Sequence, residues 1–388
     1  MPVKNRFAEL HPEITEWRRD FHQNPELLYE VHRTAARVAE LLRSFGVDEV
    51  VEGIGRTGVV GVIKGKSDTQ GRVIGLRADM DALPIHEATG VDYASQTPGV
   101  MHACGHDGHT AMLLGAAKYL AEMRNFDGTA IVIFQPAEEG GGGGLAMLED
   151  GMAERFGIQE FYGMHNMPGL APGELAIRDG AMMAAADQFD IIVTGRGGHA
   201  ASPHQNIDTT LVSAQIIVAL QSVVSRNVDP LQNAVVSVCV VETDSTAHNV
   251  IPQTVRLKGT ARTLDPAVRD LVEDAINRVA TNTAQAFGAS ADVQYHRGYP
   301  VTVNDSTAVG FAADVAKSVT GEINTSIEPL MAGEDFSYML NVRPGAYIFI
   351  GNGKTAALHS PNYVFDDSII PVGSSWYAGM VESRMPAA

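Results

Sequence analysis

Residues 130–144 read AIVIFQPAEEGGGGG, a short apolar run that ends in two neighbouring carboxylates and five glycines. The run itself, residues 130–134, matches a buried strand, which is short and uniformly apolar. Three other apolar runs also lead into polar clusters, at residues 73–76, 161–164 and 347–350. Because ligands collect at the carboxyl ends of parallel strands, we expect the four clusters to converge on one crevice.

Helical patterns surround these strands, at residues 109–123, 304–319 and 368–384. In the first of them, Leu113, Leu114, Ala117 and Leu120 recur at helical spacing and form one apolar stripe. Short apolar strands that alternate with such helices predict an α/β domain, in which a mainly parallel sheet is flanked by helices.

The segment 187–296 has a different rhythm. Its expected elements are strand 189–194, helix 208–226, strand 234–242, strand 255–262, helix 266–287 and strand 292–294. This βαββαβ order is the ferredoxin-like α+β arrangement, which can close as a separate domain. We therefore predict an inserted domain at 187–296 and a discontinuous domain made of 1–186 and 297–388.

Length and composition exclude several classes of protein. A chain of 388 residues is longer than one hydrophobic core usually covers, which favours two domains. The net charge of −18 argues against nucleic acid and against anionic membrane surfaces as partners, since both would repel it. We find no apolar run of about 18 residues that would predict a membrane span, and no signal-peptide pattern. Two cysteines cannot build a disulfide framework, so we expect a cytoplasmic protein.

The cluster MHACGHDGH at residues 101–109 introduces metal-binding chemistry. A Cys-X-His pair, Cys104 and His106, together with distant histidines and carboxylates is a ligand set for Zn, Mn, Ni or Co, whereas a thiolate disfavours Mg and Ca. By itself Cys104 fits a small core residue as well. Cys239 lies in the apolar run AVVSVCVV, where we predict a core position.

Glu138 and Glu139 are the most informative pair. Two adjacent carboxylates after a buried strand repel each other, so one must be neutralised by a metal or a proton. In a hydrolase, one glutamate holds the metal and the other takes a proton from metal-activated water. A solvated acidic loop is the alternative, but the apolar run just before the pair argues against it. The glycines at 140–144 lack the ending of a phosphate-binding loop, and no serine-nucleophile motif is present.

Eight motifs together resemble the aminoacylase and glutamate-carboxypeptidase metallopeptidase family, in its amidohydrolase branch of hippurate hydrolases, N-acyl-amino-acid amidohydrolases and auxin-conjugate hydrolases. They occur in the family's order along nearly the whole chain: RADMDALPI (77–85), MHACGHDGHTAMLLGAA (101–117), FQPAEEGGGG (134–143), GMHNMPG (163–169), GRGGHAASPH (195–204), HNVIPQ (248–253), GEDFSYM (333–339) and LHSPNYVFDD (358–367).

The resemblance implies a set of metal ligands for two divalent ions per subunit: Cys104, His106, Glu139, His165 and His359. It implies that Glu138 is the general base and that Asp81 matches the family's acid beside the ligands. Asp79 stands where the wider family has a ligand histidine, which leaves the partition of ligands between the two ions open.

The inserted domain carries three further residues of the resemblance. His199 resembles a histidine that reaches the partner subunit's site and supports the oxyanion, which implies a homodimer or higher homo-oligomer formed through this lid. Asn249 and Arg262 resemble groups that bind the substrate carboxylate; a surface salt bridge fits Arg262 equally well.

The expected function is metal-dependent hydrolysis of the amide bond of small N-acyl-L-amino acids, hippurate-like or N-acetylated. A dipeptidase or carboxypeptidase of the same family is the alternative enzyme. A non-catalytic amino-acid-binding protein is a third possibility, against which the intact Glu138–Glu139 pair argues, since a binding protein needs no proton shuttle.

Overall fold

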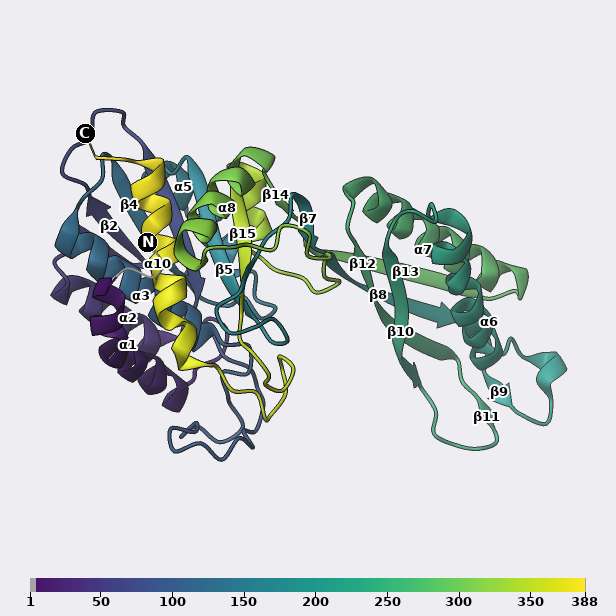
Figure 1. The fold of residues 1–388 in the computed structure, drawn as a ribbon. Helices are drawn as coiled ribbons and strands as arrows, with labels where there is room; N and C mark the ends of the chain where they lie inside the picture. Colours follow the sequence, from purple (N-terminus) through teal and green to yellow (C-terminus); the bar gives the residue numbers. More distant parts are fainter. Residues whose placement is uncertain (1–4, 388) are drawn as a thin grey trace. The chain divides into compact units, whose positions relative to one another are not determined.

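The computed structural model describes residues 5–387, which form two units (Figure 1). One unit contains the residues up to Gly180, the segment Val303–Glu328 and the residues from Asp335 on; the other contains Ala181–Thr302 and Pro329–Glu334. Each unit encloses a hydrophobic core of its own, as separate domains do.

The sheet of the first unit has seven strands in the order β1-β2-β4-β3-β5-β15-β6. The four predicted apolar runs are its parallel central strands: β4 (Thr129–Gln135), β3 (Val73–Asp79), β5 (Glu160–Met167) and β15 (Gly345–Gly351). Antiparallel strands flank them: β1 (Glu49–Ile54), β2 (Gly58–Lys64) and β6 (Leu175–Ala176). The mainly parallel α/β domain is thus confirmed, and the carboxyl ends of the four central strands share one edge.

Helices cover this sheet. Five of them bury side chains in its main core: α1 (Asn5–Gln23), α2 (His32–Ser44), α3 (His106–Met123), α8 (Ser306–Thr320) and α10 (Ile370–Arg384). Shorter helices are α4 (Gly143–Glu149), α5 (Met152–Arg155) and α9 (Ser337–Val342). Helix α3 begins at His106 rather than at the predicted residue 109, so its first turn carries part of the His-rich motif.

The second unit is an antiparallel sheet with two helices. Its strands follow the order β10-β12-β8-β13 and comprise β8 (Ala185–Thr194), β10 (Ala234–Thr243), β12 (Thr254–Thr263) and β13 (Ser290–Tyr299). The helices are α6 (Thr209–Ser222) and α7 (Pro266–Ala286), and the side chains of Asp208 and Asp265 cap their N-termini. The predicted βαββαβ order is confirmed.

The predicted core position of Cys239 is wrong. Its side chain is exposed, and the strand that carries it, β10, is an edge strand of the sheet. The pairing of β10 with β12 also shifts register between Val238 and Val240. An apolar run cannot reveal which face of an edge strand remains uncovered, which is why the sequence misled here.

One helical stretch among residues 5–387, Thr209–Asn227, is long and apolar enough to cross a membrane by length and composition alone, a test that core helices of soluble proteins also pass. Three of its apolar side chains, Val212, Ile216 and Leu220, are buried in the core of the second unit.

Candidate metal centre

The clusters at the four central strands meet at one edge of the first unit. Several groups of ligand atoms there lie within 4.8 Å of one another: Cys104, His106 and His165; Cys104, Glu139 and His359; His106, Glu138 and Glu139; and Asp79, His106 and His109. The structure thus brings together all five residues expected as metal ligands, and the expected general base Glu138 lies among them.

Hydrogen bonds fix the orientation of two of the histidine rings. Nδ1 of His106 lies 2.9 Å from the carbonyl oxygen of Asp81, and Nδ1 of His165 lies 2.7 Å from the carbonyl oxygen of Asn166. Because a carbonyl oxygen can only accept, Nδ1 carries a proton in both rings, so in the neutral ring the lone pair is on Nε2. In His165 this lone pair faces Sγ of Cys104 at 3.4 Å.

The Nε2 atom of His106 indicates that the residues fit a cation. It is buried and has no hydrogen-bond partner. Its nearest carboxylate oxygens, on Asp79 and Glu139, are 3.8 and 3.9 Å away, which is too far for a hydrogen bond. Buried polar atoms are rarely left unsatisfied, and a divalent ion among soft and borderline donors would satisfy this one.

The electrostatics of the cluster favour positive charge. Burial, reinforced by the carboxylates of Glu139 and Glu138, raises the pKa of the Cys104 thiol well above its usual value. Burial alone would lower the pKa of His106, but the neighbouring carboxylates outweigh it and raise that pKa to about 10. The carboxylate of Glu139, whose Oε1 lies 3.3 Å from Nε2 of His359, raises the pKa of His359. The metal-free pocket therefore retains protons that a metal would displace.

Asp81 holds the two glutamates by their backbone. Its carboxylate oxygens accept the N–H groups of Glu138 at 2.9 Å and Glu139 at 3.1 Å, and the side chain is fully buried. The preceding residue, Ala137, has a φ of 54°, a left-handed conformation that non-glycine residues adopt only under constraint. Asp81 thus controls the direction in which both glutamate side chains leave the chain.

Sequence reasoning left the role of Asp335 open. Its carboxylate accepts hydrogen bonds from the Gln135 side chain at 2.7 and 2.8 Å, from Arg77 at 2.9 Å and from the Gly144 N–H at 2.8 Å. It thereby ties the end of β4 to the last glycine of the glycine run. The signal was present in GEDF, but a pairing across about 200 positions has no local pattern.

The three residues expected from the lid belong to the second unit. His199 in β9 (Gly198–His199) pairs with Val250 in β11 (Val250–Ile251), and the Ala200 N–H donates to the carbonyl oxygen of Asn249 at 3.0 Å. His199 and Asn249 are therefore neighbours. Arg262 is not with them: it lies near the other end of β12, eight residues from the end at Thr254, or about 26 Å along the strand.

Arg262 has no carboxylate partner among the described residues. Its Nη1 donates instead to the carbonyl oxygens of Ala261 and Asp187, at 2.9 and 3.3 Å. The Asp187 carboxylate is already used by Arg269, Tyr295 and the Gly298 N–H. Burial lowers the pKa of Arg262. This half-buried guanidinium is not the surface salt bridge that the sequence had left open.

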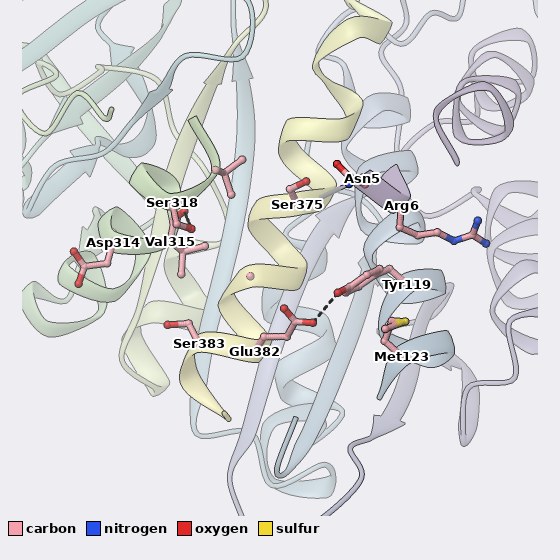
Figure 2. Close-up of a pocket in the computed structure, with 12 residues that line it drawn as sticks. Asn5, Arg6, Tyr119, Met123, Asp314, Val315, Ser318, Ser375, Glu382 and Ser383 are labelled. Atoms are coloured by element: carbon pink, nitrogen blue, oxygen red, sulfur yellow. Dashed lines mark hydrogen bonds between the residues drawn. The ribbon is translucent and has the colours of Figure 1, made fainter. Parts of the chain in front are cut away.

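A cavity of the first unit, of about 700 Å³, is lined by α1, α3, α8 and α10 and contains none of the expected site residues. In Figure 2, Tyr119 of α3 points toward Glu382 of α10, to which it donates a hydrogen bond of 3.0 Å. The chemistry of the molecule lies elsewhere, at the strand ends.

Comparisons with known proteins agree with this geometry. The peptidase family M20/M25/M40 matches residues 75–383. Relatives include a hippurate hydrolase of Campylobacter jejuni (45% identical; 95% of this chain, 96% of the relative), an N-acetyl-L-cysteine deacetylase of Bacillus subtilis (41%; 94% and 86%) and thermostable carboxypeptidase 2 of Saccharolobus solfataricus (38%; 97% and 96%). A solved structure from Bacillus subtilis, described as a dinuclear metal-binding peptidase of the M20 family, is similar with a TM-score of 0.84 and 33% identity, covering 98% of this chain and all of that one. Because of the match over residues 75–383, the named relatives and the cluster of possible ligands, the chain belongs to the M20/M25/M40 peptidase family and is a metal-dependent amidohydrolase of that family.

Proposed function

We propose that the protein hydrolyses the amide bond of N-acyl-L-amino acids, either hippurate-like or N-acetylated, with two divalent ions per subunit drawn from Zn, Mn, Ni and Co. The ligands are Cys104, His106, Glu139, His165 and His359. The observation that carries the proposal is the convergence of these five donors around a glutamate pair whose backbone Asp81 holds. The hippurate hydrolase and deacetylase among the relatives support the substrate class.

When bound, divalent ions lower the pKa of water and polarise the carbonyl oxygen of the substrate. Glu138 accepts the proton of the attacking water and later returns it to the leaving amine. Its side chain is only 7% exposed, so little bulk water competes for that proton. Glu139 serves as a ligand, and Asp81 keeps the two neighbouring glutamates in these separate roles.

The lid contributes three residues to this function: His199 stabilises the oxyanion, while Asn249 and Arg262 bind the substrate carboxylate. The Arg262 guanidinium supports its part, since it donates to carbonyl oxygens and pairs with no carboxylate among the described residues. Because Arg262 lies about 26 Å along β12 from the end near the other two, one copy of the domain cannot present all three to a small substrate. Two copies can.

This separation supports a homodimer or higher homo-oligomer formed through residues 187–296, with the remainder of the chain as the catalytic domain. The edge strand β10 and the exposed Leu211 and Val218 of α6 are available as a contact surface. Nucleic acid and membranes are not among the proposed partners. With two unpaired cysteines, one of them a ligand, the cytoplasm is the proposed location.

A carboxypeptidase or dipeptidase activity is the second candidate, because a carboxypeptidase is among the relatives. A non-catalytic amino-acid-binding protein is least consistent with the site. Purified protein should be stripped with a chelator, reloaded with each metal in turn and given hippurate, N-acetyl amino acids and dipeptides. Metal-restored turnover that favours the N-acyl compounds supports the proposal, and full turnover by protein shown to be metal-free contradicts it.

The contribution of the lid has its own test. His199→Ala should lower kcat while metal content stays unchanged, and mixing it with an Arg262→Ala protein should restore part of the activity through mixed dimers. Unchanged kcat in His199→Ala, or full turnover by a monomer, would exclude a role for the partner subunit.

A further inference from the structure

Asp79 and His109 are fully buried beside the metal centre, yet they belong to none of the ligands proposed above. Oδ1 of Asp79 lies 2.6 Å from Nδ1 of His109, and Oδ2 accepts from Arg77 at 2.6 Å. Nε2 of His109 accepts the backbone N–H of Asn166 at 2.9 Å. The His109 ring therefore carries its proton on Nδ1, and the lone pair of Nε2 accepts a peptide N–H. No lone pair of this ring remains to bind a cation.

Asn166 extends this chain of hydrogen bonds to two of the ligands. It directly follows His165 in β5, so the bond from its N–H to His109 fixes the peptide that carries the His165 ring. Its side-chain amide donates to the carbonyl oxygen of Cys104 at 2.6 Å, and its side-chain oxygen accepts from the Tyr363 hydroxyl at 2.7 Å. One side chain thus joins the end of β5 to the loop that bears the thiol.

The residues of this chain of hydrogen bonds are closely packed around Gly105. Gly105, between Cys104 and α3, has a φ of 86°. A Cβ atom there would lie 2.3 Å from Nδ2 of Asn166 and 2.5 Å from the hydroxyl oxygen of Tyr363. The turn therefore requires glycine twice, for its backbone conformation and for the close approach of Asn166.

We propose that Asp79, His109 and Asn166 form a positioning relay that holds Cys104 and His165 in place, and that none of the three binds metal. The relay explains why an aspartate stands at position 79: Arg77 and His109 use its two oxygens, so it orients ligands instead of being one. The inference rests on the ligand set of the proposed function.

Metal affinity of the full-length, metal-free protein, titrated with Co²⁺ or Mn²⁺, tests the relay. His109→Phe removes the hydrogen bonds of the ring to Asp79 and Asn166 at similar shape, and should weaken binding by about 10–100-fold, as changes behind a ligating histidine usually do. His109→Gln, whose amide oxygen can still accept the Asn166 N–H, should recover part of the affinity. Ser374→Ala is the matched control. Ser374 of α10 makes a buried hydrogen bond to Met112 of α3, the helix that also carries His109, and its loss should leave the affinity unchanged.

Cys104→Ala is titrated beside these variants to separate the two hypotheses. If it loses affinity while His109→Phe binds as the unaltered protein does, the relay is overturned and the ligand set stands. If Cys104→Ala also binds normally, the ligand set fails, and the relay fails with it.

A spectroscopic readout avoids variants that fold poorly. In the ¹⁵N spectrum of the histidine-labelled protein, His109 should show the Nδ1–H tautomer both without metal and with Zn²⁺, with Nε2 free of a coordination shift. A coordination shift at Nε2 of His109 on adding Zn²⁺ would overturn the proposal.

Discussion

Asp81→Asn isolates the contribution of one carboxylate to the geometry of the glutamate pair. In the native site each carboxylate oxygen accepts one backbone N–H, from Glu138 at 2.9 Å and from Glu139 at 3.1 Å. Asparagine keeps the shape but has a single acceptor, so its NH₂ group must face one of the two N–H donors. One buried N–H then loses its partner, and the charge that strengthened both bonds is gone.

The size of the effect follows from that count. A buried donor without a partner costs about 1–3 kcal/mol, which corresponds to a decrease of about 5–150-fold in the population of the correct geometry. We expect kcat/KM for an N-acyl amino acid to fall within this range. The free energy of unfolding should fall by less than this cost. Burial raises the pKa of Asp81, and the neutral amide avoids the cost of burying a charge.

The assay combines kcat/KM, metal content and thermal unfolding for Asp81→Asn and one control. Asp127→Asn is that control: Asp127 also accepts a backbone N–H, that of Thr69 at 2.8 Å, but it lies just before the start of β4, at the opposite end from the glutamates. The control should lose stability without losing turnover. Asp81→Asn with turnover within twofold of the unaltered protein would refute the reasoning.

Three further predictions concern the proposed ligands and the proposed base. Glu138→Gln should retain metal and lower kcat by about 10²–10⁴-fold with KM nearly constant, whereas Glu139→Ala should lose metal and activity together; metal retained in the second variant and lost in the first would exchange the two roles. Metal binding should release about two protons at pH 7–8, because the pKa of the Cys104 thiol is raised and that of His106 is about 10. Metal affinity should therefore rise with pH. Calorimetry in buffers of different ionisation enthalpy measures the proton release, and its absence would contradict the prediction. Cys104→Ala should lower metal content and Cys239→Ala should not; equal metal content in both variants would remove the thiolate from the ligand set.

Much of the fold was predictable because its signals are local. The four central strands are short apolar runs, and a polar cluster directly after such a run marks the carboxyl end of a strand whatever its neighbours are. The lid followed in the same way from the order of its elements. The start of α3 was placed three residues late, because His106 and Asp107 look like loop residues until their burial in the site is known.

What the sequence could not provide were contacts set by backbone direction or by distant segments. Asp81 acts on the peptide groups of Glu138 and Glu139, and no side-chain pattern reports on a peptide group. Asp335 reaches Gln135 from 200 positions away. Cys239 was misplaced because an edge strand and a central strand have the same composition, and only the assembled sheet reveals which one is uncovered.

The electrostatics of the centre give a reason for a metal site that is independent of the relatives. Asp81 and His106 are fully buried and Cys104 is 7% exposed, and all three have raised pKa values. Burial alone would raise the pKa of a carboxyl or a thiol but lower that of an imidazole, so the shift of His106 must come from the surrounding carboxylates. The pocket therefore has an excess of negative charge that protons offset in the absence of ions. Divalent ions would neutralise the same negative charge by binding to the lone pairs of protein atoms that otherwise hold protons. Proton release and metal binding must therefore be coupled at this site.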